Sequence, residues 1–148
     1  MKILKWLLIA LIVVPAIVVI GAYVRNKAIG PVGWAEDDTL KALRSKMKDP
    51  DSMIVRSQYV VQKNTESGGR YIYVCGVVDG KNSFGGYSGG ARFASWSSSG
   101  GGHFDFLDVQ IEDVQAKATA ARVKMLSAFE SVYWNSRCVD SAHPALTP

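Results

Sequence analysis

An uncharged apolar run near the N-terminus limits what this chain can fold into more than any other feature. Residues 6–24, WLLIALIVVPAIVVIGAYV, contain no charged side chain. At about 1.5 Å rise per residue, a helix of this run is roughly 28 Å long, close to the thickness of a bilayer's hydrocarbon core. Trp6 and Tyr23 stand near its two ends, where amphipathic rings favour the membrane interface. The run therefore predicts a transmembrane helix within residues 1–27 that anchors the protein in a lipid bilayer.

A cleaved signal peptide is the alternative interpretation of the same run. MKILK supplies a basic start, and Gly21 and Ala22 are small residues that suit a signal peptidase. The run is longer than the apolar region of a usual signal peptide, which favours the anchor. The basic residues on its N-terminal side favour a cytoplasmic N-terminus. We therefore expect a single-pass inner-membrane protein with a periplasmic C-terminal domain, or a secreted domain if the run is cleaved.

The net charge of +4 does not indicate a nucleic-acid-binding face. Four basic residues flank the apolar run: Lys2, Lys5, Arg25 and Lys27. Residues 28–148 contain 13 basic and 13 acidic residues, so this part of the chain is neutral. Because nucleic-acid binding depends on a concentrated basic surface, we expect no nucleic-acid partner.

The two cysteines, Cys75 and Cys138, also bear on the compartment. An even number of cysteines in an exported domain predicts a disulfide. The alternative is that both are buried and unpaired. With only two histidines and no C-x-x-C spacing, the cysteines form no recognisable zinc pattern. We expect neither a metal nor another cofactor.

The rest of the chain predicts an extracytoplasmic α+β domain at residues 34–139, after a linker at 28–33 and before a flexible tail at 140–148. An N-terminal helix is expected from Trp34 to Met47, where apolar residues recur at helical spacing and a proline follows at position 50. Segments rich in β-branched and aromatic residues predict three to four antiparallel strands. The expected strands are residues 53–63, 70–78, 91–97 and 103–109.

A long C-terminal helix is predicted from Gln110 to Asn135. Apolar residues in this segment step by three and four positions. Met125 and Phe129 lie on the apolar face, and we expect both in the core. The predicted fold is an antiparallel meander sheet with the N-terminal and the long C-terminal helix packed on one of its faces.

The stretch from Cys75 to Gly90, CGVVDGKNSFGGYSGG, has three interpretations. A phosphate-binding loop is excluded, because the spacing between the glycines is one residue short and Asn82 replaces the hydroxyl residue of that motif. A structural turn is favoured by Asp79-Gly80, a typical hairpin pair. A glycine loop with aromatic rings is also a binding surface for a peptide or glycan. The candidate contacts are Lys81, Asn82, Phe84 and Tyr87.

A catalytic alternative centres on His103 and Asp105. Strand alternation places both side chains on one face, where the carboxylate can orient the imidazole. Cys75 is the candidate thiol nucleophile, although a disulfide removes it. This alternative predicts a periplasmic hydrolase that uses His103 and nearby carboxylates.

Several short motifs occur together between Leu40 and Phe93. They are Lys48-Asp49-Pro50-Asp51-Ser52, Val74-Cys75-Gly76, Lys81-Asn82 and Phe84-Gly85-Gly86-Tyr87, with a looser similarity at Phe129, Trp134 and Cys138. Together they resemble an uncharacterised family of small exported proteins from bacteria and their phages. Val78-Asp79-Gly80 departs from the Val-Asn-Ala that is frequent in that family. The resemblance implies export and paired cysteines, and it implies no activity.

These features favour a non-enzymatic binding module of the bacterial envelope over the hydrolase. The expected partners are the lipid bilayer and an envelope protein or glycan.

Overall fold

The computed structural model describes the backbone of residues 2–148 and the side chains of residues 11–25 and 28–148. The chain forms two compact units, Met1–Trp34 and Ala35–Pro148. The first unit contains the N-terminal part of α1 (Lys2–Lys46). Gly30 interrupts the helical backbone with a φ of 61°, a left-handed conformation that favours glycine. The expected linker at residues 28–33 lies within this interrupted helix.

The predicted transmembrane helix is supported only in a coarser form. Large apolar side chains from Leu11 to Val24 are exposed. Among the described residues, no single helix combines the length and the apolar composition needed to cross a membrane. Two consecutive segments, Leu11–Arg25 and Ala28–Lys46, meet those criteria as a pair. The side chains of residues 6–10, the start of the predicted span, lie outside the described residues.

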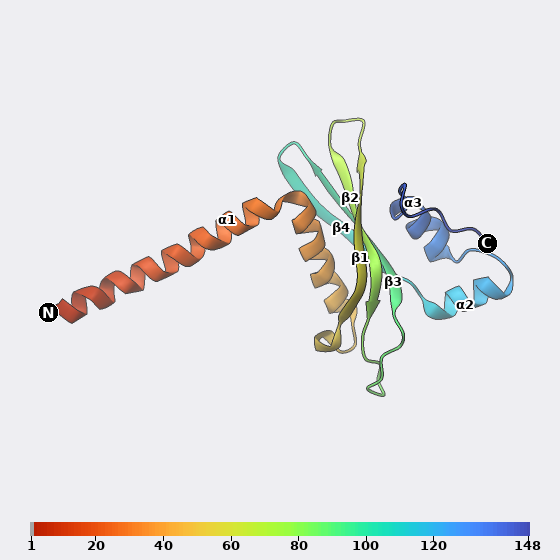
Figure 1. The fold of residues 1–148 in the computed structure, drawn as a ribbon, viewed down its shortest axis with the longest axis horizontal. Coiled ribbons are helices and arrows are strands. Elements are labelled where there is room, and N and C mark those ends of the chain that lie inside the picture. Colours follow the sequence, from red (N-terminus) through yellow and green to blue (C-terminus); the bar gives the residue numbers. More distant parts are fainter. Residues whose placement is uncertain (1) are drawn as a thin grey trace. The chain divides into compact units, whose positions relative to one another are not determined.

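A four-stranded antiparallel sheet forms the centre of the second unit (Figure 1). Its strands are β1 (Ile54–Asn64), β2 (Arg70–Asp79), β3 (Ala91–Gly100) and β4 (His103–Ile111). Each strand pairs with the next one in the sequence, which confirms the predicted meander. The β1–β2 and β3–β4 hairpin loops therefore lie at one end of the sheet, and the β2–β3 loop lies at the other.

The C-terminal part of α1 packs against one face of this sheet. Ala35, Thr39 and Leu43 recur every fourth residue and are fully buried, as expected for one face of a helix. The Lys46 ammonium donates a hydrogen bond to the backbone carbonyl of Val109 in β4, at 2.9 Å. The N-terminal helix predicted within the domain is thus confirmed.

The C-terminal elements cover the opposite face. Tyr73 and Cys75 of β2 form a buried cluster with Phe129 and Cys138. The residues between them, such as Val74, point to the other side of the sheet because side chains alternate along a strand. β2 is consequently buried on both faces over most of its length. The prediction that both helices pack on one face is wrong.

The predicted long helix from Gln110 to Asn135 is also wrong. β4 continues to Ile111, and the following elements are α2 (Val114–Arg122), the π-helical segment η2 (Phe129–Trp134) and the short α3 (Asn135–Arg137). Lys124 adopts a φ of 54° and interrupts the helical backbone. Met125 is 63% exposed, so its predicted core position is wrong, whereas Phe129 is buried as expected.

A buried ion cluster explains why the helix does not begin at Gln110. Arg92 of β3 donates hydrogen bonds to the carboxylates of Glu112 and Glu130. This contact holds Glu112 beside the sheet in an extended segment. Asp113 then caps α2 by accepting hydrogen bonds from the N–H groups of residues 115 and 116. A long-range contact therefore overrides the local helical pattern.

The predicted disulfide is present between Cys75 and Cys138. It joins β2, an inner strand, to the residue that follows α3. The segment 140–148, expected as a flexible tail, makes defined contacts with the domain. The His143 ring stacks on Tyr59, with ring centroids 3.7 Å apart, and Nδ1 of His143 lies 2.8 Å from the Asp140 carboxylate.

Candidate functional site

The β2–β3 loop, residues 80–90, is built on a buried carboxylate at its base. The Asp79 side chain is fully buried and forms an ion pair with Arg56, with an oxygen–nitrogen distance of 2.5 Å. Its second oxygen accepts hydrogen bonds from the backbone N–H groups of Gly80 and Ser88, at 2.9 and 3.2 Å. One carboxylate thus joins the first and last parts of the loop to β1.

The charge state of Asp79 follows from these contacts. Burial raises the pKa of its carboxyl, but the hydrogen bonds from Arg56, Gly80 and Ser88 outweigh that effect. The pKa of Asp79 is therefore below its ordinary value. An ionised Asp79 is part of the loop's structure at neutral pH.

The tip of the loop is held by a second side chain, that of Asn82. Its amide oxygen accepts hydrogen bonds from the N–H groups of Phe84 and Gly86. The backbone N–H of Asn82 also donates to the carbonyl of Gly86, and Lys81 pairs with Tyr87 in an isolated β-bridge. Asn82, one of the predicted contact residues, is therefore a turn-former.

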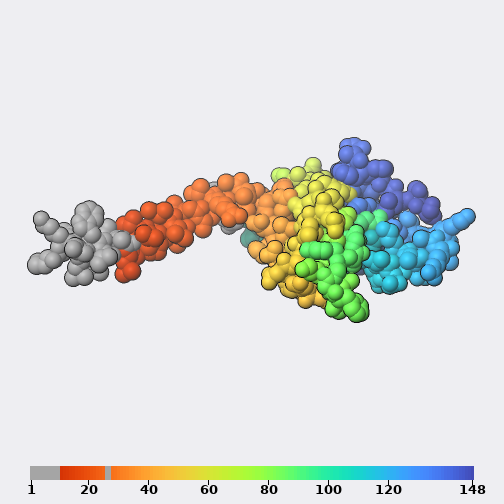
Figure 2. All heavy atoms as spheres, turned by 60° about the horizontal axis from the view of Figure 1, so that its bottom comes forward, coloured from red at the N-terminus to blue at the C-terminus, as the bar shows by residue number. Residues whose placement is uncertain are grey.

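Two aromatic rings extend from this framework. Phe84 is 97% exposed and Tyr87 is 44% exposed. Figure 2 shows the loop, coloured green, projecting from the surface of the domain. Lys81 is exposed beside them, and the Lys48 ammonium lies 3.1 Å from the Ser83 hydroxyl. The loop thus presents an apolar tip with ammonium groups at its base.

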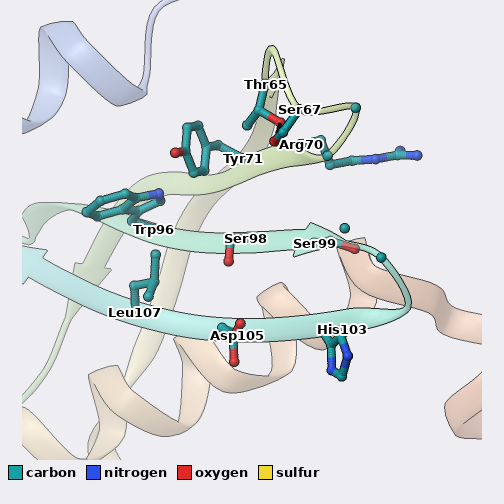
Figure 3. A pocket seen from close by; sticks show the side chains of 14 residues that line it. Thr65, Ser67, Arg70, Tyr71, Trp96, Ser98, Ser99, His103, Asp105 and Leu107 are labelled. Carbon is teal, nitrogen blue, oxygen red and sulfur yellow. Dashed lines mark hydrogen bonds between the residues drawn. The ribbon is translucent and has the colours of Figure 1, made fainter.

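His103 and Asp105 lie at the other end of the sheet. They line an open cavity of about 480 Å³ between the β1–β2 and β3–β4 hairpins. Figure 3 shows both side chains on the edge strand β4, with Tyr71 and Trp96 across the cavity. Lys81 does not line this cavity. The structure therefore separates the two groups of predicted site residues.

The cavity does not contain the carboxylate–imidazole hydrogen bond that the hydrolase alternative predicts. Within residues 28–148, neither the side chain of His103 nor that of Asp105 has a hydrogen-bond or ion-pair partner, so the carboxylate does not orient the imidazole. Cys75 is buried and bonded to Cys138, which removes the candidate thiol nucleophile. The same described part of the chain contains no group of three metal-ligating side chains.

Sequence reasoning missed Tyr71 and Trp96 as site residues. Both lie in predicted strands, and nothing in the local sequence distinguishes a strand aromatic in the core from one that lines a cavity. Their proximity depends on the pairing of β2 with β3, which brings Tyr71 opposite Ser98, two positions from Trp96.

Comparison with protein-family models, with curated proteins and with solved structures finds no match for this chain. The resemblance to small exported bacterial and phage proteins consequently stays a prediction.

Proposed function

We propose that this protein is a membrane-anchored, periplasmic binding module that contacts an envelope protein through the β2–β3 loop. The observation that carries the proposal is the 97% exposed ring of Phe84 on a loop held by side-chain hydrogen bonds. Exposing a large apolar ring to water is unfavourable, and a fixed loop loses little entropy when it binds. Both properties suit a contact residue.

The chemistry of the loop favours a particular kind of partner. Phe84 fits an apolar recess, and Lys81 and Lys48 favour carboxylates around the rim of that recess. The partner we propose is therefore a protein surface with an apolar pocket and an acidic border.

The proposed location draws on two further features. An N-terminal pair of apolar segments is compatible with an anchor or a signal, and the Cys75–Cys138 bond is typical of oxidising compartments. A phosphatase fused after Pro148 tests this point. We expect an active fusion in cells, and an inactive fusion would refute export.

Site-specific photo-crosslinking in cells tests the binding role. A benzophenone amino acid at position 84 is expected to form a protein adduct, and the same probe at Thr119, an exposed residue of α2, serves as the control. Adding Lys81→Glu to the position-84 probe should reduce the adduct. Equal labelling from both positions, or adducts with lipid alone, would rule out the proposed contact.

A further inference from the structure

The open cavity at the hairpin end of the sheet has the volume of a small-molecule site. Its volume of about 480 Å³ falls within the range of ordinary ligand pockets, roughly 300–1,000 Å³. It opens on the sheet face opposite α1, next to the area that the C-terminal elements cover. Because the β2–β3 loop is at the opposite end of the sheet, this cavity is independent of the binding role proposed above.

One end of the cavity is aromatic and held in place. The rings of Tyr71 and Trp96 meet edge to face, with centroids 5.7 Å apart and planes at 73°. The guanidinium of Arg137 lies 5.4 Å from the centroid of the Trp96 ring. Contacts on two sides therefore fix the indole, so a ligand meets a preformed apolar wall.

The other end offers polar groups that are free to bind. Ser98 of β3 is directly opposite Asp105 of β4, and His103 lies two positions before Asp105 on the same strand. Within the described chain, the carboxylate of Asp105 and the imidazole of His103 have no partner. Thr65 and Ser67, whose hydroxyl oxygens are 3.1 Å apart, line the opposite rim. The polar end thus supplies a carboxylate acceptor, an imidazole and several hydroxyl groups.

The charges of the lining select against ionic ligands. Arg70 donates to the side chain of Gln62 at 3.2 Å, and Figure 3 shows it extending away from the cavity. An anion would therefore meet the Asp105 carboxylate without a facing guanidinium. A divalent cation needs several oxygen ligands, and Asp105 is the single carboxylate among the lining residues. A wholly apolar ligand would desolvate Asp105 without replacing its hydrogen bonds.

We propose that this cavity binds a neutral saccharide of about one or two rings. A sugar has hydroxyl groups that donate to Asp105 and exchange hydrogen bonds with Ser98 and His103. It also has C–H faces that pack against Trp96 and Tyr71. The site binds without hydrolysis, because glycosidases generally place two carboxyl groups on either side of the scissile bond and this cavity has one.

Amide and indole NMR spectra of the full-length, ¹⁵N-labelled protein test the proposal. The protein is held in a zwitterionic detergent, because a glycoside detergent would itself offer sugar rings to the cavity. The probes are cellobiose and the disaccharide of N-acetylglucosamine, with inorganic phosphate as an anionic comparison. The indole N–H of Trp96, which has no hydrogen-bond partner in the described part of the chain, is assigned from the spectrum of Trp96→Phe.

At least one disaccharide is expected to shift the signals of Trp96, Ser98 and Asp105 in a saturable manner. Asp105→Ala should weaken this binding by about tenfold, the effect of losing a charged acceptor. Ser98→Ala is a second variant that removes a contact. Asp108→Ala is the matched control, because Asp108 is on the same strand but does not line the cavity.

Three outcomes would overturn the proposal. The first is that neither disaccharide shifts these signals at millimolar concentration. The second is that Asp105→Ala and Ser98→Ala, with amide spectra that show an intact fold, bind as tightly as the wild type. The third is that phosphate produces the saturable shifts and the sugars do not.

Discussion

Replacing Asp79 with asparagine is the most direct test of how the β2–β3 loop is held. The change keeps the shape of the side chain, removes its charge and replaces one acceptor oxygen with an N–H donor. If the amide oxygen keeps the hydrogen bonds from the N–H groups of Gly80 and Ser88, the amide NH₂ faces the Arg56 guanidinium, donor against donor; in the opposite orientation those two N–H groups lose their acceptor. We expect the domain to lose stability and the base of the loop to open.

The size of the effect follows from the burial of the two partners. Breaking a buried ion pair costs about 3–5 kcal/mol, and a single hydrogen bond to a charged group contributes about 1.5–3 kcal/mol. The Asp79 side chain is fully buried, but that of Arg56 is 48% exposed and regains part of its hydration when the pair is lost. We therefore expect the free energy of unfolding to fall by about 3 kcal/mol, which lowers Tm by about 10 °C in a domain of this size.

The same substitution should change the dependence of stability on pH. The pKa of Asp79 in the folded state is below the ordinary value of 3.8. As the pH falls, the unfolded state therefore binds this proton first, and the stability that Asp79 contributes is lost as the pH passes through the folded-state pKa. In Asp79→Asn, the free energy of unfolding should therefore fall less steeply as the pH decreases through the acidic range. Some of this fall should remain, because the hydrogen bonds that Glu130 makes with Arg92 and Ser127 outweigh the effect of burial and lower the pKa of Glu130 as well.

Thermal unfolding followed by circular dichroism measures stability, and amide hydrogen exchange at Gly80 and Ser88 reports on the loop. The matched control is Asp51→Asn, an exposed aspartate that should change the free energy of unfolding by less than about 0.5 kcal/mol. An Asp79→Asn variant that unfolds within about 2 °C of this control, far less than the expected shift of about 10 °C, and that keeps wild-type exchange at both amides would show that Asp79 does not hold the loop.

Three further predictions concern other parts of the domain. Phe84→Ala should leave the free energy of unfolding within about 0.5 kcal/mol of wild type in thermal unfolding, because the ring is exposed. The double variant Cys75→Ala/Cys138→Ala should lose about 4 kcal/mol in urea unfolding, because the bond closes a long loop in the unfolded chain. Arg92→Met should lose about 3–5 kcal/mol in urea and raise the pKa of Glu130, measured by carboxyl NMR, because it removes the guanidinium that pairs with Glu130 and leaves Glu112 with only the Lys117 ammonium, at 3.5 Å.

Each of these three predictions has a control or an outcome that would contradict it. A Phe84→Ala variant that unfolds well below the wild-type temperature would mean that the ring supports the fold. For the double cysteine variant, wild type under reducing conditions should show a similar loss, and no loss in either would contradict the chain-entropy argument. Arg122→Met in exposed α2 should be neutral, and Arg92→Met would contradict the ion cluster if it were equally neutral.

The sheet could be predicted from the sequence because its signals are local. Aromatic and β-branched residues mark β1 and β2. The turn expected at Asp79-Gly80 lies further along the loop, where the N–H of Gly85 donates to the carbonyl of Asn82 and Gly85 has a positive φ. The helix predicted from Gln110 failed because the contact between Glu112 and Arg92 spans 20 positions and has no local signature. Apolar residues at helical spacing, such as Met125 and Val132, are exposed in the folded domain.

The two candidate sites also differ in whether their sequence signals are local or long-range. The glycine stretch identified the loop that carries Phe84, because that loop is one continuous segment. The cavity residues Tyr71, Trp96 and Asp105 come from three strands, and their proximity depends on strand register. Composition alone does not encode that register.

The disulfide also has a consequence for the order of events during synthesis. Cys75 and Cys138 are 63 positions apart, and the chain between them includes β3 and β4. At about 5–20 residues per second, that interval takes roughly 3–13 s to synthesise. Throughout this time Cys75 has no Cys138 thiol to pair with. The covalent link therefore closes only after all four strands of the sheet have been synthesised.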